Sequence, residues 1–135
     1  MKLFFPPRIS ADTVPFWDGC KKHRLLIQKC STCGHLRWPA SYLCPECLSE
    51  KAEWVEMSGK GTVYSHITMC KAFHPTLKEQ VPYVVAEIDL DEGVRLLSNI
   101  EDDGTTQIRC GAKVEVVWQD YEEYTKPIFR ITGVE

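Results

Sequence analysis

The sequence lacks any long apolar segment. No hydrophobic run approaches the roughly 20 residues that a membrane-spanning helix requires. The N-terminal stretch "MKLFFPPRIS" carries only a brief apolar pair before two prolines, which is too short for the apolar region of a signal peptide. We therefore expect a cytoplasmic protein with no membrane association.

Positive charge is scarce in the C-terminal part of the chain. Residues 53–135 contain eight Lys or Arg against fifteen Asp or Glu, whereas residues 1–52 contain eight against four. Surfaces that bind nucleic acid depend on Lys and Arg side chains that neutralise phosphates. The acidic C-terminal part therefore argues against nucleic acid as a partner.

The short motifs of common enzyme classes are also missing. The sequence has no Gly-rich phosphate loop, no Ser-centred nucleophile elbow and no His-Glu metalloprotease signature. Asp89, Asp91 and Glu92 crowd one turn, where paired carboxylates can transfer protons, but a solvated turn explains them more simply. The residues alone do not indicate an enzyme.

Cysteine, by contrast, is plentiful. The chain has seven cysteines, and four of them form two identical Cys-x-x-Cys pairs in "CSTCGHLRWPASYLCPEC". In a reducing compartment this spacing is typical of a tetrahedral structural zinc site without an open coordination position. Gly34 permits the positive φ that such a turn usually requires. The expected ligands are Cys30, Cys33, Cys44 and Cys47.

The remaining cysteines are candidates for a reactive thiol. Cys70 has Lys71 beside it and His74 four residues later, an arrangement that a nucleophile can use. Alternatively, Cys20, Cys70 and Cys110 are simply small buried apolar residues, as most free cysteines are.

The N-terminal part predicts a short helix and a ribbon. Thr13 or Asp12 can cap a helix near residues 13–23, and Phe16 and Cys20 fall on one face of it. Gly19 weakens this helix. A strand is expected in "RLLIQ", and two short ribbon strands are expected in "HLRWPASYL" between the cysteine pairs.

From Trp54 onwards the pattern is that of short strands between turns. Five or six evenly spaced strands favour a small closed barrel. The expected strands are "AEWVEM", "TVYSHITM", "YVVAEIDL", "VRLLSNI", "KVEVVWQ" and "IFRITGV". The expected turns are Gly59-Lys60-Gly61, Asp91-Glu92-Gly93, Asp103-Gly104 and Gly111. Long polar connections at 70–82 and 120–127 are where we expect binding residues.

The cysteine-rich segment, followed by "GKGTVYSHITM", "VPYVVAEIDLDEGVRLLSNI" and "GAKVEVVW", resembles a known family. Its members, described as a domain of unknown function, join a rubredoxin-like zinc ribbon to an OB-fold and partner thiolases and other acyl-CoA enzymes. The resemblance covers about Phe16 to about Val134. It implies a mainly β fold with an N-terminal segment and helix (1–28), a zinc ribbon (29–52) and an OB-fold barrel (53–135).

The resemblance also implies a function. The chain would be an accessory, non-catalytic subunit of a thiolase-like, acyltransferase or lipid-transfer-type aldolase complex, with two copies of each chain. It would stabilise the partner and help to form or gate its acyl-CoA site, with a coenzyme A thioester bound at the interface. The four cysteines would hold one structural zinc ion.

Contacts with acyl-CoA or the partner are expected in and next to the loop 70–82. Lys71 and Lys78 can meet CoA phosphates, and Phe73 can pack on apolar groups, although a solvated loop is the alternative. The candidate contacts are Lys71, Phe73, His74, Lys78 and Tyr83.

Two further surfaces are expected to meet the partner: "FFPPRISADTVPFW" and one barrel face. The alternative for Phe16 and Trp17 is packing on the protein's own ribbon.

Two other functions remain as alternatives. Zinc ribbons and OB-folds bind single-stranded nucleic acid in other proteins, and four cysteines in this pattern hold a single iron in redox proteins of the rubredoxin type.

Overall fold

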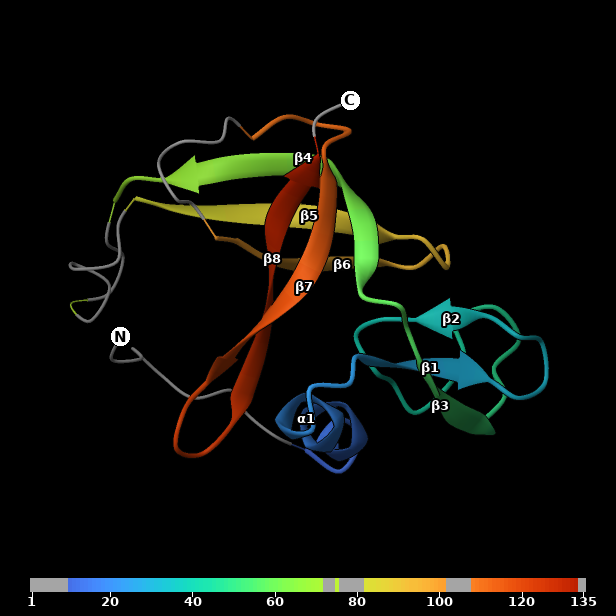
Figure 1. Ribbon diagram of the computed structural model, residues 1–135. Helices are drawn as coiled ribbons and strands as arrows, with labels where there is room; N and C mark the ends of the chain where they lie inside the picture. Colours follow the sequence, from blue (N-terminus) through green and yellow to red (C-terminus); the bar gives the residue numbers. More distant parts are fainter. Residues whose placement is uncertain (1–9, 72–74, 76–81, 102–107, 134–135) are drawn as a thin grey trace.

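The computed structural model describes residues 10–71, 75, 82–101 and 108–133 (Figure 1). A three-stranded sheet of order β2-β1-β3 precedes a closed barrel of order β4-β5-β6-β8-β7. The predicted mainly β fold, with an N-terminal helix, a ribbon and a small barrel, is therefore confirmed. The elements are α1 (Val14–Lys21), β1 (Leu26–Cys30), β2 (Leu36–Arg37), β3 (Ala52–Glu56), β4 (Lys60–Met69), β5 (Tyr83–Leu90), β6 (Arg95–Ile100), β7 (Lys113–Asp120) and β8 (Thr125–Gly133). Within the described ranges, no helix has the length and apolar character that crossing a bilayer demands.

Helix α1 lies within the predicted range 13–23. Thr13 is its N-cap residue, but the Thr13 side chain makes no capping bond; its Oγ1 instead accepts a hydrogen bond from the Ser10 backbone N–H at 2.9 Å. Phe16 and Cys20 are 8% and 0% exposed, which confirms that they share the buried face of the helix.

The end of α1 is a tight turn at His23, which has a φ of 58°. The His23 N–H donates to Cys20 O and the Arg24 N–H donates to Gly19 O, both at 2.9 Å. This pair of bonds is the Schellman arrangement that ends many helices. It turns the chain directly into β1.

The His23 side chain joins this turn to the barrel. Its ring stacks on Trp118 with the ring centroids 5.4 Å apart, and its Nε2 lies 2.9 Å from Asp120 Oδ1, 97 residues away in sequence. This contact with His23, together with a bond from the Thr125 hydroxyl, lowers the pKa of Asp120. Helix α1 is thereby fixed against the β7–β8 hairpin.

The ribbon sheet differs from the sequence prediction in two respects. Only β2 forms in "HLRWPASYL", and the second predicted strand is absent, because the Ser41 N–H turns back to donate to Gln28 Oε1 at 3.0 Å. The strand predicted in "AEWVEM" forms as β3, but its placement among the barrel strands is wrong. It pairs with β1 along its whole length, from Leu26↔Glu56 to Cys30↔Ala52.

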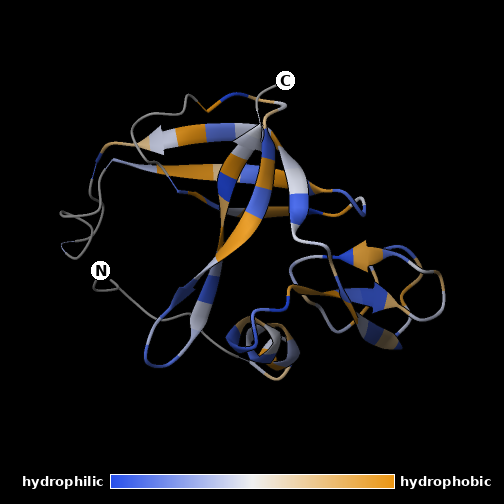
Figure 2. Cartoon of the chain, viewed as in Figure 1, coloured by the Kyte–Doolittle hydropathy of each residue, from blue (hydrophilic) through white to orange (hydrophobic). Residues whose placement is uncertain are grey.

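The barrel interior follows the period of two expected for β5. Alternate residues Val84, Ala86, Ile88 and Leu90 are buried, and hydrophobic and hydrophilic residues alternate along the barrel strands (Figure 2). Turns expected at Gly93 and Gly111 are present, with φ values of 102° and 90°. The turn expected at Asp103-Gly104 lies outside the described residues.

The predicted long connection at 120–127 is shorter than expected. The last residue of β7 pairs with the first of β8, Asp120↔Thr125, and the Tyr121 N–H donates to Tyr124 O at 2.8 Å. The segment is therefore a tight hairpin, and Lys126 and Pro127 belong to a strand.

Gly19 sets the distance between α1 and β1. A Cβ at this position would lie 2.8 Å from Leu26 Cδ1 and 2.9 Å from the backbone oxygen of Arg24. Glycine is unfavourable in a helix, but at position 19 it permits the close approach of α1 to β1.

We expect Gly19→Ala to lower the free energy of unfolding by about 1–3 kcal/mol, because overpacking against backbone outweighs the gain in helix propensity. Asp18→Ala, at an exposed position of the same helix, is the control and should stay within about 0.5 kcal/mol of wild type. Denaturant unfolding measures both variants. A Gly19→Ala protein more stable than wild type would contradict this close packing of α1 on β1.

Candidate metal centre and apolar pockets

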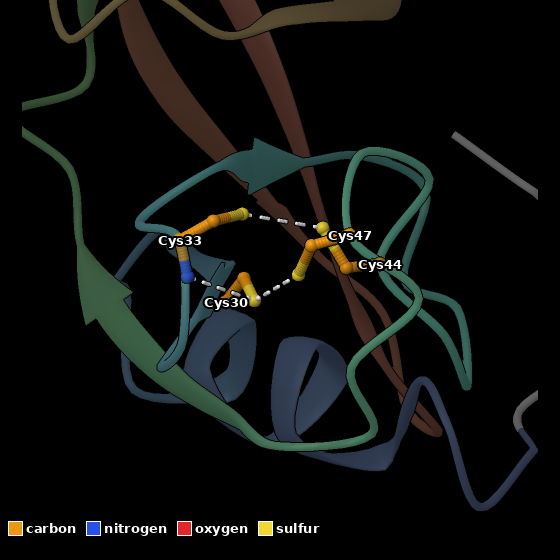
Figure 3. A group of neighbouring side chains, drawn as sticks. All are labelled: Cys30, Cys33, Cys44 and Cys47. Carbon is orange, nitrogen blue, oxygen red and sulfur yellow. Dashed lines mark hydrogen bonds between the residues drawn. The ribbon is translucent and has the colours of Figure 1, made fainter.

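Four cysteine side chains converge at one end of the ribbon (Figure 3). Cys30 ends β1 and Cys33 follows in the next turn, while Cys44 and Cys47 come from a second turn. The Sγ atoms of Cys30 and Cys47 lie 3.5 Å apart, and those of Cys33 and Cys44 lie 3.6 Å apart. All four sulfur atoms fall within 4.8 Å of one another.

This arrangement fits a tetrahedral metal ion. A Zn–S bond of about 2.3 Å places sulfur atoms about 3.8 Å apart in a tetrahedron, close to the separations observed. The same separations are far longer than a disulfide bond, and all four thiols are free. Four thiolates fill the coordination shell, so the site suits a structural ion rather than one that activates water.

The two turns that carry the cysteines have the same backbone geometry. The Gly34 N–H donates to Cys30 O and the Leu48 N–H donates to Cys44 O, both at 2.9 Å, with φ values of 81° at Gly34 and 64° at Leu48. The sequence predicted the positive φ at Gly34. It did not predict Leu48, because leucine rarely adopts this conformation.

Backbone N–H groups also point at the sulfur atoms. Those of Cys33 and Glu46 lie 3.4 Å from the Sγ atoms of Cys30 and Cys44. The bond from Cys33 lowers the pKa of the Cys30 thiol to about 6. These bonds favour the thiolate form that a metal ion requires at Cys30 and Cys44, the first cysteine of each turn, whereas the neighbouring thiols raise the pKa of Cys33 and Cys47.

The other three thiols lie apart from this centre. Cys20 is fully buried, and burial raises its pKa to about 12, so this thiol is inert at neutral pH. Cys70 and Cys110 are exposed. His74, the base suggested for Cys70, lies outside the described residues, so a nucleophilic Cys70 stays a prediction.

A pocket of about 310 Å³ lies where α1 and the ribbon meet the barrel. We call it the barrel pocket. Its walls are mainly apolar and come from α1, the residue after β2, and strands β5, β6 and β8. Its lining includes Phe16, Trp17, Trp38, Tyr83, Leu97 and Lys126.

One end of the barrel pocket is polar. Lys126 Nζ donates to Asn99 Oδ1 at 2.5 Å, and Asn99 Nδ2 donates to Val84 O at 2.9 Å, which fixes the orientation of the amide. Burial lowers the pKa of Lys126. The pocket thus combines aromatic walls with one ammonium donor.

A second pocket of about 180 Å³ lies between α1 and the ribbon sheet. We call it the ribbon pocket. It shares Phe16, Trp17 and Trp38 with the barrel pocket, so these three side chains separate the two. Arg37, which is 5% exposed, also lines the ribbon pocket.

The outer face of β4, β5 and β6 carries exposed apolar side chains. Ile67 and Leu97 are 58% and 53% exposed. Their strand partners, Val85 for Ile67 and Glu87 for Leu97, point away from the barrel interior. Val85 and Leu97 also line the barrel pocket. Val85, Leu97 and Ile67 therefore extend the apolar lining of the pocket onto the open face of the sheet, next to the charged Glu87.

The expected acyl-CoA and partner contacts are only partly described. Tyr83 begins β5 and lines the barrel pocket, and Lys71 is exposed just beyond β4. Phe73, His74 and Lys78 lie outside the described residues. Phe16 belongs to the protein's own core, and Trp17 packs against that core.

Sequence reasoning missed Arg37, Trp38 and Lys126. Lys126 had a weak signal, since it lies in the segment 120–127 that was expected to bind. Arg37 had none, because nothing in a two-residue strand distinguishes a buried arginine from an exposed one.

Comparison with known proteins matches both halves of the chain. The family model for the "ChsH2, rubredoxin-like zinc ribbon domain" matches residues 17–53. The model for the "ChsH2, C-terminal OB-fold domain" matches residues 54–119. The ribbon and the barrel thus each have a counterpart in known proteins, in the same order.

Curated relatives include three proteins of different description. A probable enoyl-CoA hydratase alpha subunit of Thermomonospora curvata is 38% identical over 92% of this chain and 39% of its own length. A DUF35 domain-containing scaffold protein of Methanothermobacter thermautotrophicus is 34% identical over 85% of this chain and 87% of its own. The benzoylsuccinyl-CoA thiolase subunit BbsA of Thauera aromatica is 32% identical over 65% of this chain and 58% of its own.

A solved structure has the same architecture. A chain of the Ltp2-ChsH2(DUF35) aldolase superimposes with a TM-score of 0.83 at 37% identity, over 93% of this chain and 98% of that one. The chain spans only about two fifths of the hydratase alpha subunit. Much of that longer relative therefore has no counterpart in this chain.

We expect Cys33→Ser to lose bound metal and to aggregate, because a half-ligated ribbon exposes its strands and apolar side. Cys110→Ala is the matched control and should keep the metal content of wild type, because Cys110 lies apart from the four clustered thiols. Elemental analysis of the purified variants measures the metal. Full metal content and solubility in Cys33→Ser would show that the ligand set is wrong.

We further expect the native metal to be zinc, with one ion per chain and a colourless protein. The rubredoxin-type alternative predicts a red protein with stoichiometric iron. Metal analysis and a visible absorption spectrum of protein purified without added metal distinguish the two.

Proposed function

Because this chain belongs to the ChsH2 (DUF35) family, in which a rubredoxin-like zinc ribbon precedes an OB-fold, we propose that it is an accessory subunit of a heteromeric acyl-CoA-processing enzyme. The partner is a thiolase-like or aldolase enzyme that supplies the catalytic residues. Relatives described as subunits of a hydratase and a thiolase, and a chain of an aldolase, support this proposal.

The observation that carries the proposal is the apolar surface that runs from the barrel pocket onto β4–β6. Scattered exposed hydrophobic residues are ordinary, but exposed apolar residues that adjoin an apolar pocket are typical of an interaction site. Ile67 and Leu97 are more than half exposed and lie beside the pocket wall. Docking of the partner here would bury them and cover the pocket mouth.

The barrel pocket is suited to the acyl part of a coenzyme A thioester. Its volume of about 310 Å³ is at the lower end of the range for small-molecule sites, about 300–1,000 Å³. Aromatic walls would pack on the acyl chain, and Lys126 or Tyr83 would donate to a carbonyl oxygen. With the thioester held between the two proteins, the subunit helps to form and gate the partner's acyl-CoA site.

A non-catalytic role agrees with the chemistry of the barrel pocket. Among the described residues that line it, the polar side chains are those of Tyr83, Ser98, Asn99 and Lys126. Ser98 Oγ donates to Pro127 O at 3.0 Å, which occupies its hydroxyl proton. These residues include no pair of nucleophile and base, so the reacting groups would come from the partner.

Docking would also stabilise the partner and determine the stoichiometry. Thiolase-type enzymes form symmetric dimers, and each half would present the same surface. We propose a complex with two copies of each chain.

Co-expression with the thiolase-like or aldolase enzyme encoded beside it tests the proposal. We expect the two chains to co-elute in size-exclusion chromatography, and we expect Leu97→Lys to abolish co-elution, because a charge would be buried in an apolar contact. Thr132→Lys, at an exposed position of β8, is the matched control and should co-elute like wild type.

Separate elution of the wild-type chains, together with a partner that is fully active and stable alone, would contradict the accessory role. If Leu97→Lys and Thr132→Lys both co-elute, the complex forms through another surface. Metal content and thermal unfolding of each variant establish that it is folded.

A further inference from the structure

Arg37 is a buried cation without a counter-charge in the described part of the chain. Its Nε donates to Gln28 Oε1 at 2.9 Å and its Nη2 donates to Ser41 O at 3.2 Å. Its Nη1 is buried and makes no hydrogen bond to any described residue. Both acceptors are neutral, and the ion pairs of the described residues do not include Arg37.

This situation is costly in free energy, and it differs from that of three other described arginines. The more exposed Arg24, Arg95 and Arg130 each pair with a carboxylate. Water already solvates these exposed charges, so they need a paired carboxylate less than the buried Arg37 does. A guanidinium that is only 5% exposed has lost most of its hydration, and a buried charge is normally paired. A ligand that brings a negative charge would offset this cost.

The ribbon pocket is the space that Arg37 adjoins. In the ribbon sheet, Gln28 pairs with Arg37 on one side and with Trp54 on the other, so these three side chains form a row facing the same way. Helix α1 closes the opposite side with Phe16 and Trp17. The pocket thus has aromatic walls and one cationic group.

We propose that the ribbon pocket binds a small organic carboxylate with a flat apolar body, of about the size of benzoate. The carboxylate accepts from the guanidinium of Arg37, which lines the pocket, in a charge-assisted hydrogen bond, and the ring packs among Trp17, Trp38 and Trp54. The volume of about 180 Å³ is sufficient, since cavities of about 150 Å³ hold benzene in other proteins. Inorganic phosphate does not suit the pocket, because its remaining oxygens would face aromatic carbon.

This site is distinct from the one proposed for the acyl-CoA thioester. The two pockets share only the dividing side chains Phe16, Trp17 and Trp38, and Lys126 lines only the barrel pocket. The inference therefore goes beyond the accessory role and does not depend on it.

Tryptophan fluorescence during titration of the metal-loaded chain with benzoate is the test. Three of the four tryptophans line the ribbon pocket, and the fourth, Trp118, stacks on His23. We expect a saturable change with benzoate, at least tenfold weaker binding of benzyl alcohol, and no saturable change with phosphate.

Variants locate the binding. Arg37→Met should weaken benzoate binding at least tenfold, whereas Arg130→Met, at an exposed arginine, should bind like wild type. Ala40→Leu, which fills the pocket while keeping Arg37, should also abolish binding. Metal content and thermal unfolding are measured for each variant, and Ala40→Leu decides the matter if Arg37→Met does not fold.

Three results would overturn the inference: no saturable response of the wild type to benzoate, equal affinity for benzyl alcohol, or unchanged binding by a folded Arg37→Met or Ala40→Leu protein. If the wild type shows no saturable response, an acidic side chain of a protein partner becomes the next candidate to occupy the ribbon pocket. The titration uses the isolated chain, so its outcome is separate from that of the co-elution experiment.

Discussion

Four sulfur atoms within 4.8 Å of one another are the constraint on which the ribbon depends. Sheet β2-β1-β3 contains one strand of only two residues, and so small a unit buries little apolar surface of its own. Metal binding by comparable four-ligand sites supplies about 10–16 kcal/mol at neutral pH. A metal ion that joins the two cysteine turns would therefore hold the segment from Leu36 to Ala40 in place, including Arg37 and Trp38.

The functional surfaces lie where this ribbon meets the rest of the protein. Helix α1 is the common wall of both pockets, and two features fix it: the close approach of Gly19 to β1 and the contacts of His23 with Trp118 and Asp120. The metal centre thus performs no reaction itself, but it holds residues that shape the two pockets. In the proposed division of roles, the barrel side meets an acyl-CoA enzyme and the ribbon side binds a carboxylate.

Features encoded by local spacing were predictable from the sequence. The cysteine pairs and the alternation in β5 belong to this class, since a turn or a strand face needs only neighbouring residues. The partner of β3 was not predictable, because pairing along β1 rather than in the barrel depends on tertiary packing. Arg37 and Lys126 were missed for the same reason: their burial arises only when α1 and the strands come together.

Hydrogen–deuterium exchange of metal-loaded and chelator-treated protein tests most directly whether the metal centre holds the ribbon side of the pockets. We predict that metal removal accelerates exchange at the amides of β1, β2 and β3 and of the segment that contains Trp38, while β5 and β7 in the barrel keep their protection. Equal protection of the ribbon amides with and without metal would contradict this role of the metal centre.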